Sequence, residues 1–393
     1  MNAARKPRRG RIPSGVPAAP ARDKENEVRR NFVFGPVPSR RLGISLGVDV
    51  IPPKTCTLDC IYCEAGRTRR LTKRRRAYVP AAEVVRQVGA ALRKGGRVDW
   101  ITFSGCGEPT LHSGLGGMIR AVKRMTRIPV AVLTSGTLLS DPRVRRALRD
   151  ADLVVPSLDA GSARVFRQIN RPHPSLRLSR VAEGIARFRR RFPGRLWLEV
   201  VLLKGVNDSP RELARIAALA ARIRPERVQL NTAVRPPARV NAKPLDAGGL
   251  RAARLVLAKA LGDIPVEIVA GFRGAGGARR RGGIRRAILA YLARRPATMR
   301  DLAKGLGVRV EELPGPLARL AAAGAVEETS FDGRRYYRAA PARSGAPSPR
   351  PAPPLSAARP GQAGRRAPSS PSLARPTRPR SSRRGAARSS GRG

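Results

Sequence analysis

Acidic, aromatic, cysteine and histidine residues are all scarce in this chain of 393 residues. There are 27 acidic residues against 80 lysines and arginines, which gives a formal net charge of +53. Such an excess favours polyanionic partners, either nucleic acid or an anionic membrane surface. A drift toward GC-rich codons is the alternative explanation, because arginine far outnumbers lysine. Aromatic residues make up 4% of the chain, so stacking platforms for single-stranded nucleic acid are few.

Long apolar runs are also missing. No run approaches the ~18 residues that a membrane-spanning helix needs. Residues 1–30 are basic and proline-rich and lack the apolar core of a secretory signal, so we expect a cytoplasmic protein without a membrane partner. Three of the four cysteines fall within eight positions, which in such a protein indicates metal binding rather than disulfides.

Low-complexity sequence lies at both ends of the chain. Residues 1–30 and 341–393 carry +6 and +12, and we predict that both are disordered basic segments, the second rich in Arg, Pro and Ser. The remaining +35 lies on residues 31–340, so the predicted folded body is basic in its own right.

Residues 31–270 alternate short apolar strands with helical stretches. The predicted strands are 42–51, 99–104, 129–134, 152–158, 196–203 and 226–232. The predicted helices are 80–94, 114–126, 141–149, 176–192, 209–223 and 247–261. This pattern indicates an α/β fold of buried parallel strands with right-handed crossovers, either a full or partial barrel or an open doubly wound sheet. In each of these, ligands bind at the carboxyl ends of the strands.

A Gly/Arg-rich linker at 271–283 precedes a predicted second domain at 284–340. Its predicted elements are helices 284–294 and 298–306, a third helix ending at Ala323-Gly324, and a hairpin turning at Asp332-Gly333. Three helices and a hairpin predict a winged helix-turn-helix. Pro314 and Pro316 are expected to interrupt the third helix, which weakens a DNA-reading interpretation.

The cysteines Cys56, Cys60 and Cys63 follow the first predicted strand with the spacing C-x3-C-x2-C. Three thiolates on one short loop can converge on a metal centre. A structural zinc ion needs four ligands, and the candidates for a distant fourth are Cys106, His112 and His173. A four-iron cluster held by three thiolates would instead leave one iron free for a substrate or cofactor.

A glycine-rich loop follows the second predicted strand and reads Gly105-Cys-Gly107-Glu108-Pro. Glycine there allows the backbone to approach a ligand closely, and Glu108 supplies a carboxylate. Alone this motif is weak, but it becomes strong beside the cysteine motif at the neighbouring strand end.

Together these motifs resemble those of the radical S-adenosylmethionine (SAM) superfamily. The resemblance rests on C-x3-C-x-aromatic-C, with Tyr62 as the aromatic residue, and on GxGEP as the GGE motif. A longer match over roughly 31–270 resembles a branch of uncharacterised Fe–S oxidoreductases related to tRNA wyosine-base synthase. It runs through Phe34–Arg40, Ser104–Leu111, Ser157–Ala160, Ile169–Pro172, Lys204–Asp208, Leu230–Thr232 and Arg235–Pro237.

The resemblance implies a partial (β/α)6 TIM-type barrel and a set of site residues. Cys56, Cys60 and Cys63 would hold a [4Fe–4S] cluster whose fourth iron chelates SAM through its amino and carboxylate groups. The implied cofactor contacts are Tyr62 to the adenine, Gly107 and Glu108 (with Gly105 in the same loop) to the methionyl amino group, and Ser157 and Asn207 to polar groups of SAM.

The resemblance also implies the reaction. An electron from a donor such as flavodoxin or ferredoxin would cleave SAM to methionine and a 5′-deoxyadenosyl radical, which abstracts hydrogen from a substrate. Wyosine synthases carry a second cluster on upstream cysteines, but no cysteine precedes Cys56 here. Possession of that second cluster is therefore not expected. The sequence does not identify the substrate, for which tRNA or another nucleic acid is the first guess, nor the fate of SAM or the oligomeric state.

Several polar residues have both a functional and a structural interpretation. The segment Gly66–Arg76 holds seven cations in eleven residues and is either a phosphate-contacting surface or a solvated loop. We expect Cys106 to be a small buried residue and His112 and His173 to be ordinary loop histidines, while Glu199 is either a SAM contact or a paired structural carboxylate. Lys204 is either an active-site amine or a solvated strand-end lysine, and Tyr336 and Tyr337 are the best stacking candidates of the second domain.

A second hypothesis comes from another class of protein. The winged helix and the positive charge also fit a nucleic-acid-binding regulator whose cysteines hold structural zinc or a redox-sensing Fe–S cluster. A third keeps the SAM chemistry but assigns it a protein or small-molecule substrate.

Overall fold

The computed structural model of the chain describes residues 31–269 and 283–340. Its largest sheet has eight strands in the order β1-β2-β5-β6-β7-β8-β9-β10. These are β1 (Val33–Ser39), β2 (Gly43–Val48), β5 (Trp100–Phe103), β6 (Val130–Thr134), β7 (Leu153–Pro156), β8 (Arg195–Val201), β9 (Arg227–Asn231) and β10 (Val266–Ile268). Strand β1 is antiparallel to β2, and all the other neighbouring pairs are parallel.

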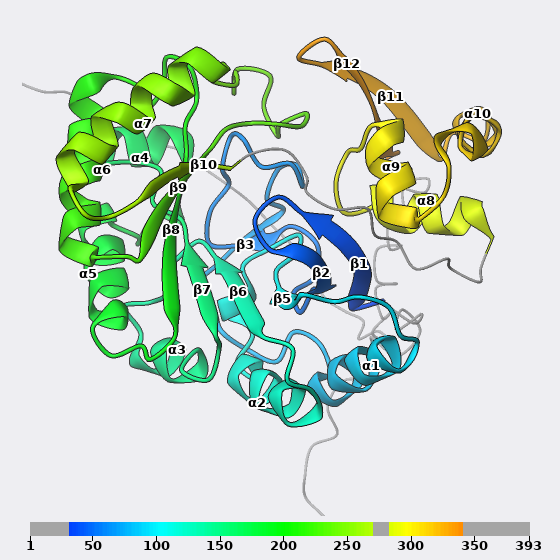
Figure 1. Cartoon of the computed structure of the whole chain (residues 1–393), viewed down its shortest axis with the longest axis horizontal. Helices are drawn as coiled ribbons and strands as arrows, with labels where there is room; N and C mark the ends of the chain where they lie inside the picture. Colours follow the sequence, from blue (N-terminus) through cyan, green and yellow to red (C-terminus); the bar gives the residue numbers. More distant parts are fainter. Residues whose placement is uncertain (1–30, 270–282, 341–393) are drawn as a thin grey trace, which may run out of the picture. The chain divides into compact units, whose positions relative to one another are not determined.

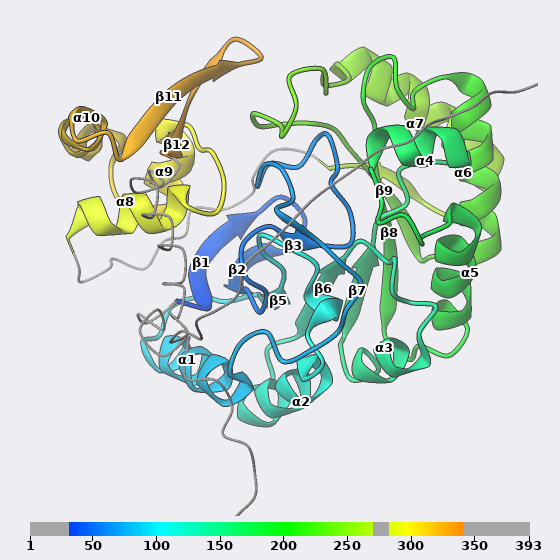
Figure 2. The same ribbon diagram turned by 180° about the vertical axis from the view of Figure 1, so that it is seen from behind.

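Helices connect the parallel strands. They are α1 (Ala81–Arg93), α2 (Leu115–Met125), α3 (Pro142–Ala147), α4 (Ala163–Ile169), α5 (Leu178–Arg189), α6 (Pro210–Ile223) and α7 (Ala247–Leu261). Figure 1 shows them along the outer face of a curved sheet, and Figure 2 shows the same layer from behind. The predicted α/β class with a parallel sheet is confirmed, and each of the six predicted strands and six predicted helices has a counterpart in the structure.

Strands β1 and β10 form the two edges of this sheet, so the described strands make an open arc and not a closed barrel. Strand β1 was not predicted, because Pro36 and Pro38 lie within it. An edge strand tolerates proline, because on one side it has no neighbouring strand to which its backbone N–H groups must donate. Its Phe34 ring lies over Gly47 of β2, where an added Cβ would come within 2.1 Å of the ring. Glycine at position 47 is therefore required for this close packing.

The two faces of the sheet carry different side chains, because successive residues of a strand point to opposite faces. In β8, Leu196, Leu198 and Val200 belong to the main core, which includes residues of the helices. Trp197 belongs to a smaller cluster with Leu42, Ala131, Leu153 and Val155. Glu199 follows Trp197 two residues closer to the carboxyl end of the strand. The inner face is thus apolar near the start of the strands and becomes polar toward their ends.

Residues 283–340 form three helices and a hairpin with a core of their own. The elements are α8 (Ile284–Leu292), α9 (Met299–Leu306), α10 (Pro314–Ala322), β11 (Val326–Phe331) and β12 (Arg334–Ala339). Ile288, Leu302 and Leu317 are among the buried residues of this core. The predicted three helices and hairpin are therefore present.

The expectation that prolines interrupt the third helix is wrong. Pro314 is the first residue of α10 and Pro316 lies in the same first turn, where the backbone N–H groups have no partner within the helix. The prolines therefore start the helix. The hairpin turns at Asp332 and Gly333 as predicted, with φ angles of 50° and 69° that suit the tight two-residue turn.

The predictions made for residues 1–30 and 341–393, and for all but the last residue of the linker 271–283, lie outside the described residues. Among the described residues, no helix is long and apolar enough to cross a membrane.

Candidate active site

The cysteine loop lies between two short paired strands. Cys56 ends β3 (Thr55–Cys56), which pairs with β4 (Arg70–Leu71). The backbone N–H groups of Asp59 and Ile61 donate to the carbonyls of Asn170 and Ile169, at 3.0 and 2.9 Å, which ties the loop to the end of α4. The loop therefore has a fixed backbone, and its three cysteines line a single cavity of about 410 Å³.

The three thiols can each supply a sulfur to one iron of an iron–sulfur cluster. Burial raises the pKa of Cys56 to about 12, and burial also raises the pKa of Cys60 and of Cys63. Such thiols become ligands only when a metal displaces their protons. Among the described residues, no three His, Cys, Asp or Glu side chains gather closely enough for one ion. A four-iron cluster takes each thiolate on a separate iron and has no such requirement.

The glycine-rich loop is held against the cysteine strand. A Cβ added to Gly107 would lie 2.2 Å from the carbonyl oxygen of Thr55, the residue before Cys56. Glu108 N donates to that same oxygen at 3.2 Å, and Lys54 N donates to the Cys106 carbonyl at 2.8 Å. Glycine at position 107 is therefore a steric requirement, and the two sequence motifs are joined physically.

Glu108 is 2% exposed and receives four hydrogen bonds. Its Oε1 accepts from the backbone N–H of Thr110 (3.0 Å) and from the hydroxyls of Thr110 and Thr134 (2.6 Å each). Its Oε2 accepts from the N–H of Ser135 at 2.7 Å. The carboxylate is thus held in one position at the wall of the cavity. Its Oε2 accepts one of these hydrogen bonds and its Oε1 accepts three.

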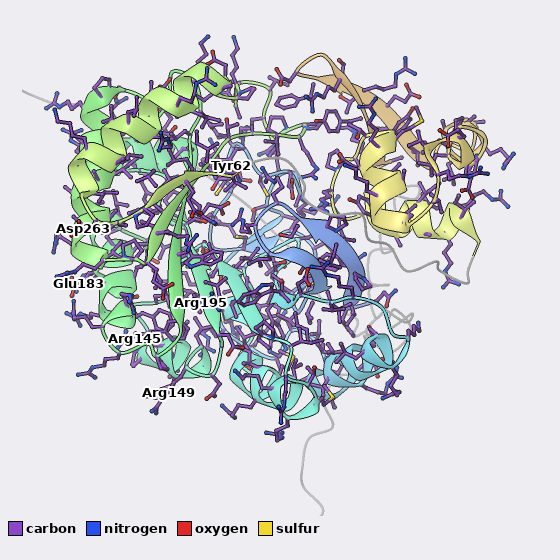
Figure 3. All side chains as sticks on the ribbon, viewed as in Figure 1. Tyr62, Arg145, Arg149, Glu183, Arg195 and Asp263 are labelled. Atoms are coloured by element: carbon purple, nitrogen blue, oxygen red, sulfur yellow. The ribbon has the colours of Figure 1, made fainter. Side chains whose placement is uncertain are left out.

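Tyr62 also lines the cavity and is anchored by a buried carboxyl that the sequence analysis did not select. Its hydroxyl donates to Oδ2 of Asp159 at 2.5 Å, and Asn170 donates to the same oxygen at 2.7 Å. Val201 N donates to Oδ1 at 2.9 Å. Burial raises the pKa of Asp159 to about 6, although these donors oppose the shift. Figure 3 shows Tyr62 within the arc of strands, while Arg145 and Arg149 lie at the periphery.

Asp159 and Asn170 support the cysteine loop through contacts with Tyr62 and Cys60. Asn170 Nδ2 lies 3.4 Å from the sulfur of Cys60 as well as donating to Asp159. The structure places Asn207 beside them and not at the cavity, because its amide donates to the carbonyls of Asp159 and Val201 at 2.7 Å each. Its predicted contact with the cofactor is therefore replaced by a role in positioning Asp159. The SLDA, INRP and GVND segments of the sequence were the signal for this network.

Replacing Asp159 with alanine is expected to lower the free energy of unfolding by about 3 kcal/mol or more. The change leaves three buried donors without an acceptor, and each such loss costs about 1–3 kcal/mol. Urea unfolding, monitored by circular dichroism, measures this change in the free energy of unfolding. Tyr62→Phe, which removes only one donor, should cost about 1 kcal/mol. Equal stability of Asp159→Ala and the wild type would contradict the network.

Ser157 and Glu199 line the cavity together, so the structure brings both predicted residues to the site. The Ser157 hydroxyl donates to Oε2 of Glu199 at 3.5 Å. Oε1 of Glu199 accepts from Asn231 at 3.1 Å and pairs with Arg41. Burial opposes ionisation of Glu199, but Arg41 and Asn231 lower its pKa. Glu199 is therefore a paired carboxylate that also faces the cavity.

The remaining candidates divide between structure and cavity. His112 is fully buried, with Nε2 2.9 Å from the Val79 carbonyl and Nδ1 accepting from Gly114 N at 3.0 Å, so it is an ordinary loop histidine. His173 likewise contacts a neighbour in its loop, Ser175. Lys204 is exposed and is not among the cavity residues. Cys106 is buried as expected, yet it also lines the cavity.

Comparisons with known proteins bear on this site. The family model "Radical SAM superfamily" matches residues 50–217. The chain is 43% identical over 222 residues to a protein named GTPase Obg of Brachyspira hyodysenteriae, over 56% of this chain and 33% of that one. It is 35% identical over 215 residues to a UPF0026 protein of Methanocaldococcus jannaschii, over 54% of this chain and 67% of that one. The chain thus spans a third of the first relative and two thirds of the second.

Among solved structures, similarity extends to SuiB of Streptococcus suis bound to S-adenosylmethionine. The TM-score is 0.42 at 16% sequence identity, and the match covers 57% of this chain and 47% of that chain.

Proposed function

Because this chain belongs to the radical SAM superfamily and to the UPF0026 proteins, we propose that Cys56, Cys60 and Cys63 hold its cluster and that the cavity beside them binds SAM. It is a radical SAM enzyme, and the cofactors of that superfamily are a [4Fe–4S] cluster and SAM. The observation that carries the assignment of residues is the joining of the cysteine and GxGEP loops through Thr55, Gly107 and Glu108 at one cavity.

Held by Cys56, Cys60 and Cys63, a [4Fe–4S] cluster would supply the reductive cleavage of SAM, with its electron from a donor such as flavodoxin or ferredoxin, for hydrogen abstraction from a substrate. The chain's own residues bind and position. Oε2 of Glu108 would accept a hydrogen bond from the methionyl ammonium, Gly105 and Gly107 would allow the backbone to approach it, and Tyr62 would contact the adenine. Ser157 lies beside Glu199, where both can receive polar groups of SAM.

Anaerobic reconstitution with iron and sulfide tests this proposal. We expect the reconstituted protein to contain about four irons and, with dithionite and SAM, to form 5′-deoxyadenosine. A protein that takes up iron but forms none would retain only the redox-sensing alternative. A protein that instead copurifies with zinc would support a structural metal site.

For the substrate we propose tRNA or another nucleic acid. Support comes from the net charge of +53 and from the segment Gly66–Arg76, which follows the cysteine loop directly. Within it Arg67, Arg69 and Arg70 are exposed, as phosphate contacts must be. Arg75 differs, because its Nε donates to the Thr110 carbonyl at 2.9 Å and so supports the loop beside Glu108.

The triple variant Arg67→Ala/Arg69→Ala/Arg70→Ala is expected to weaken RNA binding and to flatten its salt dependence. Each lost phosphate contact removes about 0.7–0.9 from the slope of log K against log salt. Filter binding of total tRNA over a salt series measures both. The matched control is Arg124→Ala/Arg146→Ala/Arg149→Ala. It removes three exposed arginines, one in α2, one in α3 and one just after α3. Equal slopes for the two triple variants would exclude this segment as the RNA contact.

We further propose that residues 284–340 are a winged-helix-like docking module. Support comes from the order of three helices and a hairpin with its own core. Stacking of bases on Tyr336 and Tyr337 is not proposed. Both side chains are buried, and the Tyr336 hydroxyl donates to the Val234 carbonyl at 2.9 Å. A role for this module in binding nucleic acid would therefore depend on its charged surface.

A further inference from the structure

Two successive arginines at the turn after β1 face the cavity. The Arg41 side chain is 9% exposed, and its Nη2 pairs with Glu199. Its Nη1 is buried and has no hydrogen-bond partner among the described residues. A buried guanidinium nitrogen without an acceptor is costly, which suggests that a ligand supplies the acceptor.

Arg40 contributes a second guanidinium to the same wall. Its Nη1 donates to Oδ1 of Asn231 at 2.8 Å, and Asn231 in turn donates to Glu199. Burial lowers the pKa of Arg40 to about 10, so the side chain stays cationic at neutral pH. Asn231 and Glu199 therefore hold the two guanidiniums beside each other at the cavity.

The charges at this wall do not balance. Five arginines and three glutamates line the cavity, namely Arg40, Arg41, Arg235, Arg294 and Arg295, and Glu64, Glu108 and Glu199. Arg235 is 3% exposed and uses Nη1 to bind Oε2 of Glu64 at 2.7 Å. Glu64 and Glu199 are thus both held in ion pairs, and the five arginines of the cavity outnumber its three glutamates by two.

We propose that Arg41, with Arg40, binds an anionic oxygen group of the substrate, a phosphate or a carboxylate, next to Glu199. The planar fork of arginine suits both groups. The inference rests on the proposed function, because it names a chemical feature of the substrate for the same cavity. SAM would be held there by the cluster and Glu108, so the unpartnered Nη1 of Arg41 is available to a second anion.

Anion binding to the reconstituted enzyme tests this, with SAM present at saturation. Inorganic phosphate is the first probe, and its binding is measured by the width of its ³¹P NMR line. Acetate is the second probe, and its binding is measured by displacement of phosphate or by the width of its own NMR line. We expect at least one probe to bind with a dissociation constant in the millimolar range. Phosphate alone would indicate a phosphate-bearing substrate, and acetate alone or preferentially would indicate a carboxylate.

Arg41→Lys is the main variant, because lysine keeps a cationic partner for Glu199 but cannot supply the free Nη1. We expect it to weaken probe binding about tenfold. The double variant Arg41→Met/Glu199→Gln, which removes both members of this ion pair, should lose binding as well. Arg149→Lys, on the periphery in Figure 3, should match the wild type. Iron content and the thermal midpoint verify that each variant is folded and loaded.

Three results would overturn the inference: no binding of either probe by the wild type, equal binding by wild type and both Arg41 variants, or competition of the probe with SAM. The last result would mean that the arginines bind the carboxylate of SAM itself. None of these results depends on turnover, so a failure here is distinguishable from a failure to form 5′-deoxyadenosine.

Discussion

Alanine at any one of positions 56, 60 and 63 is expected to abolish formation of 5′-deoxyadenosine and to reduce cluster iron to a small fraction of the wild-type content. A cluster held by three thiolates has no spare protein ligand, so the loss of one leaves two irons without a protein sulfur. Iron and sulfide analysis together with the visible absorbance of the reconstituted protein measures the loss.

Cys106→Ala provides the matched control for this experiment. Cys106 lines the same cavity and is more buried than the other three cysteines. Its replacement therefore tests whether the loss of any cavity thiol lowers the iron content. Its sulfur lies 3.6 Å from the Arg294 carbonyl oxygen, a contact consistent with a small structural residue. We expect Cys106→Ala to keep its iron and its activity. A loss of iron as large as that of Cys56→Ala would mean that Cys106 is a ligand and that no iron is free.

Glu108→Gln is expected to raise the dissociation constant of SAM by about tenfold to a hundredfold while iron content stays unchanged. The amide removes the charge that would attract the methionyl ammonium, and its NH₂ would face the N–H donor of Ser135. A charge-assisted hydrogen bond of this kind contributes about 1.5–3 kcal/mol. Equilibrium dialysis with labelled SAM measures the affinity.

Glutamate 212 offers a control with the same burial and a similar set of donors. Glu212 is buried, and its Oε1 accepts from the N–H groups of Gly161 and Ser162 at 2.7 and 2.9 Å, but it does not line the cavity. Glu212→Gln should therefore lose stability without losing affinity for SAM. If both variants bound SAM as the wild type does, Glu108 would be only a support for the loop.

The parallel sheet was predictable because each of its central strands is a short apolar run bounded by a helix. The elements that were missed are those in which local signals are weak. Strand β1 contains two prolines, β10 has three residues, and α4 has seven. Pairing along the sheet edge and packing against the rest of the fold stabilise these elements, and neither can be read from a local pattern.

The site was predictable where its chemistry lies on one continuous segment. The cysteine motif and the GxGEP loop each occupy a few consecutive residues, and the structure joins them through backbone contacts. Asp159 and Arg40 were not selected, because their partners are distant in sequence. Tyr62 is separated from Asp159 by 97 positions, and Arg40 from Asn231 by 191. Only the fold brings such pairs together.

Asn207 shows the converse error. The GVND segment correctly marked a place where the chain needs particular side chains, but the need is structural. The amide of Asn207 satisfies backbone carbonyls of two neighbouring strand ends, at Asp159 and Val201, and its Oδ1 accepts from Leu203 N at 2.8 Å. A motif residue that positions a site cannot be told from one that lines it until the hydrogen-bond partners are known.

The central claim is that the three thiolates leave one iron free to bind SAM. Electron paramagnetic resonance of the reduced enzyme with SAM carrying ¹⁷O in its carboxylate tests this most directly. We predict a cluster signal that changes when SAM is added and that is further broadened by ¹⁷O compared with unlabelled SAM. Identical spectra with labelled, unlabelled and no SAM would mean that the cluster does not bind SAM, and would contradict the claim.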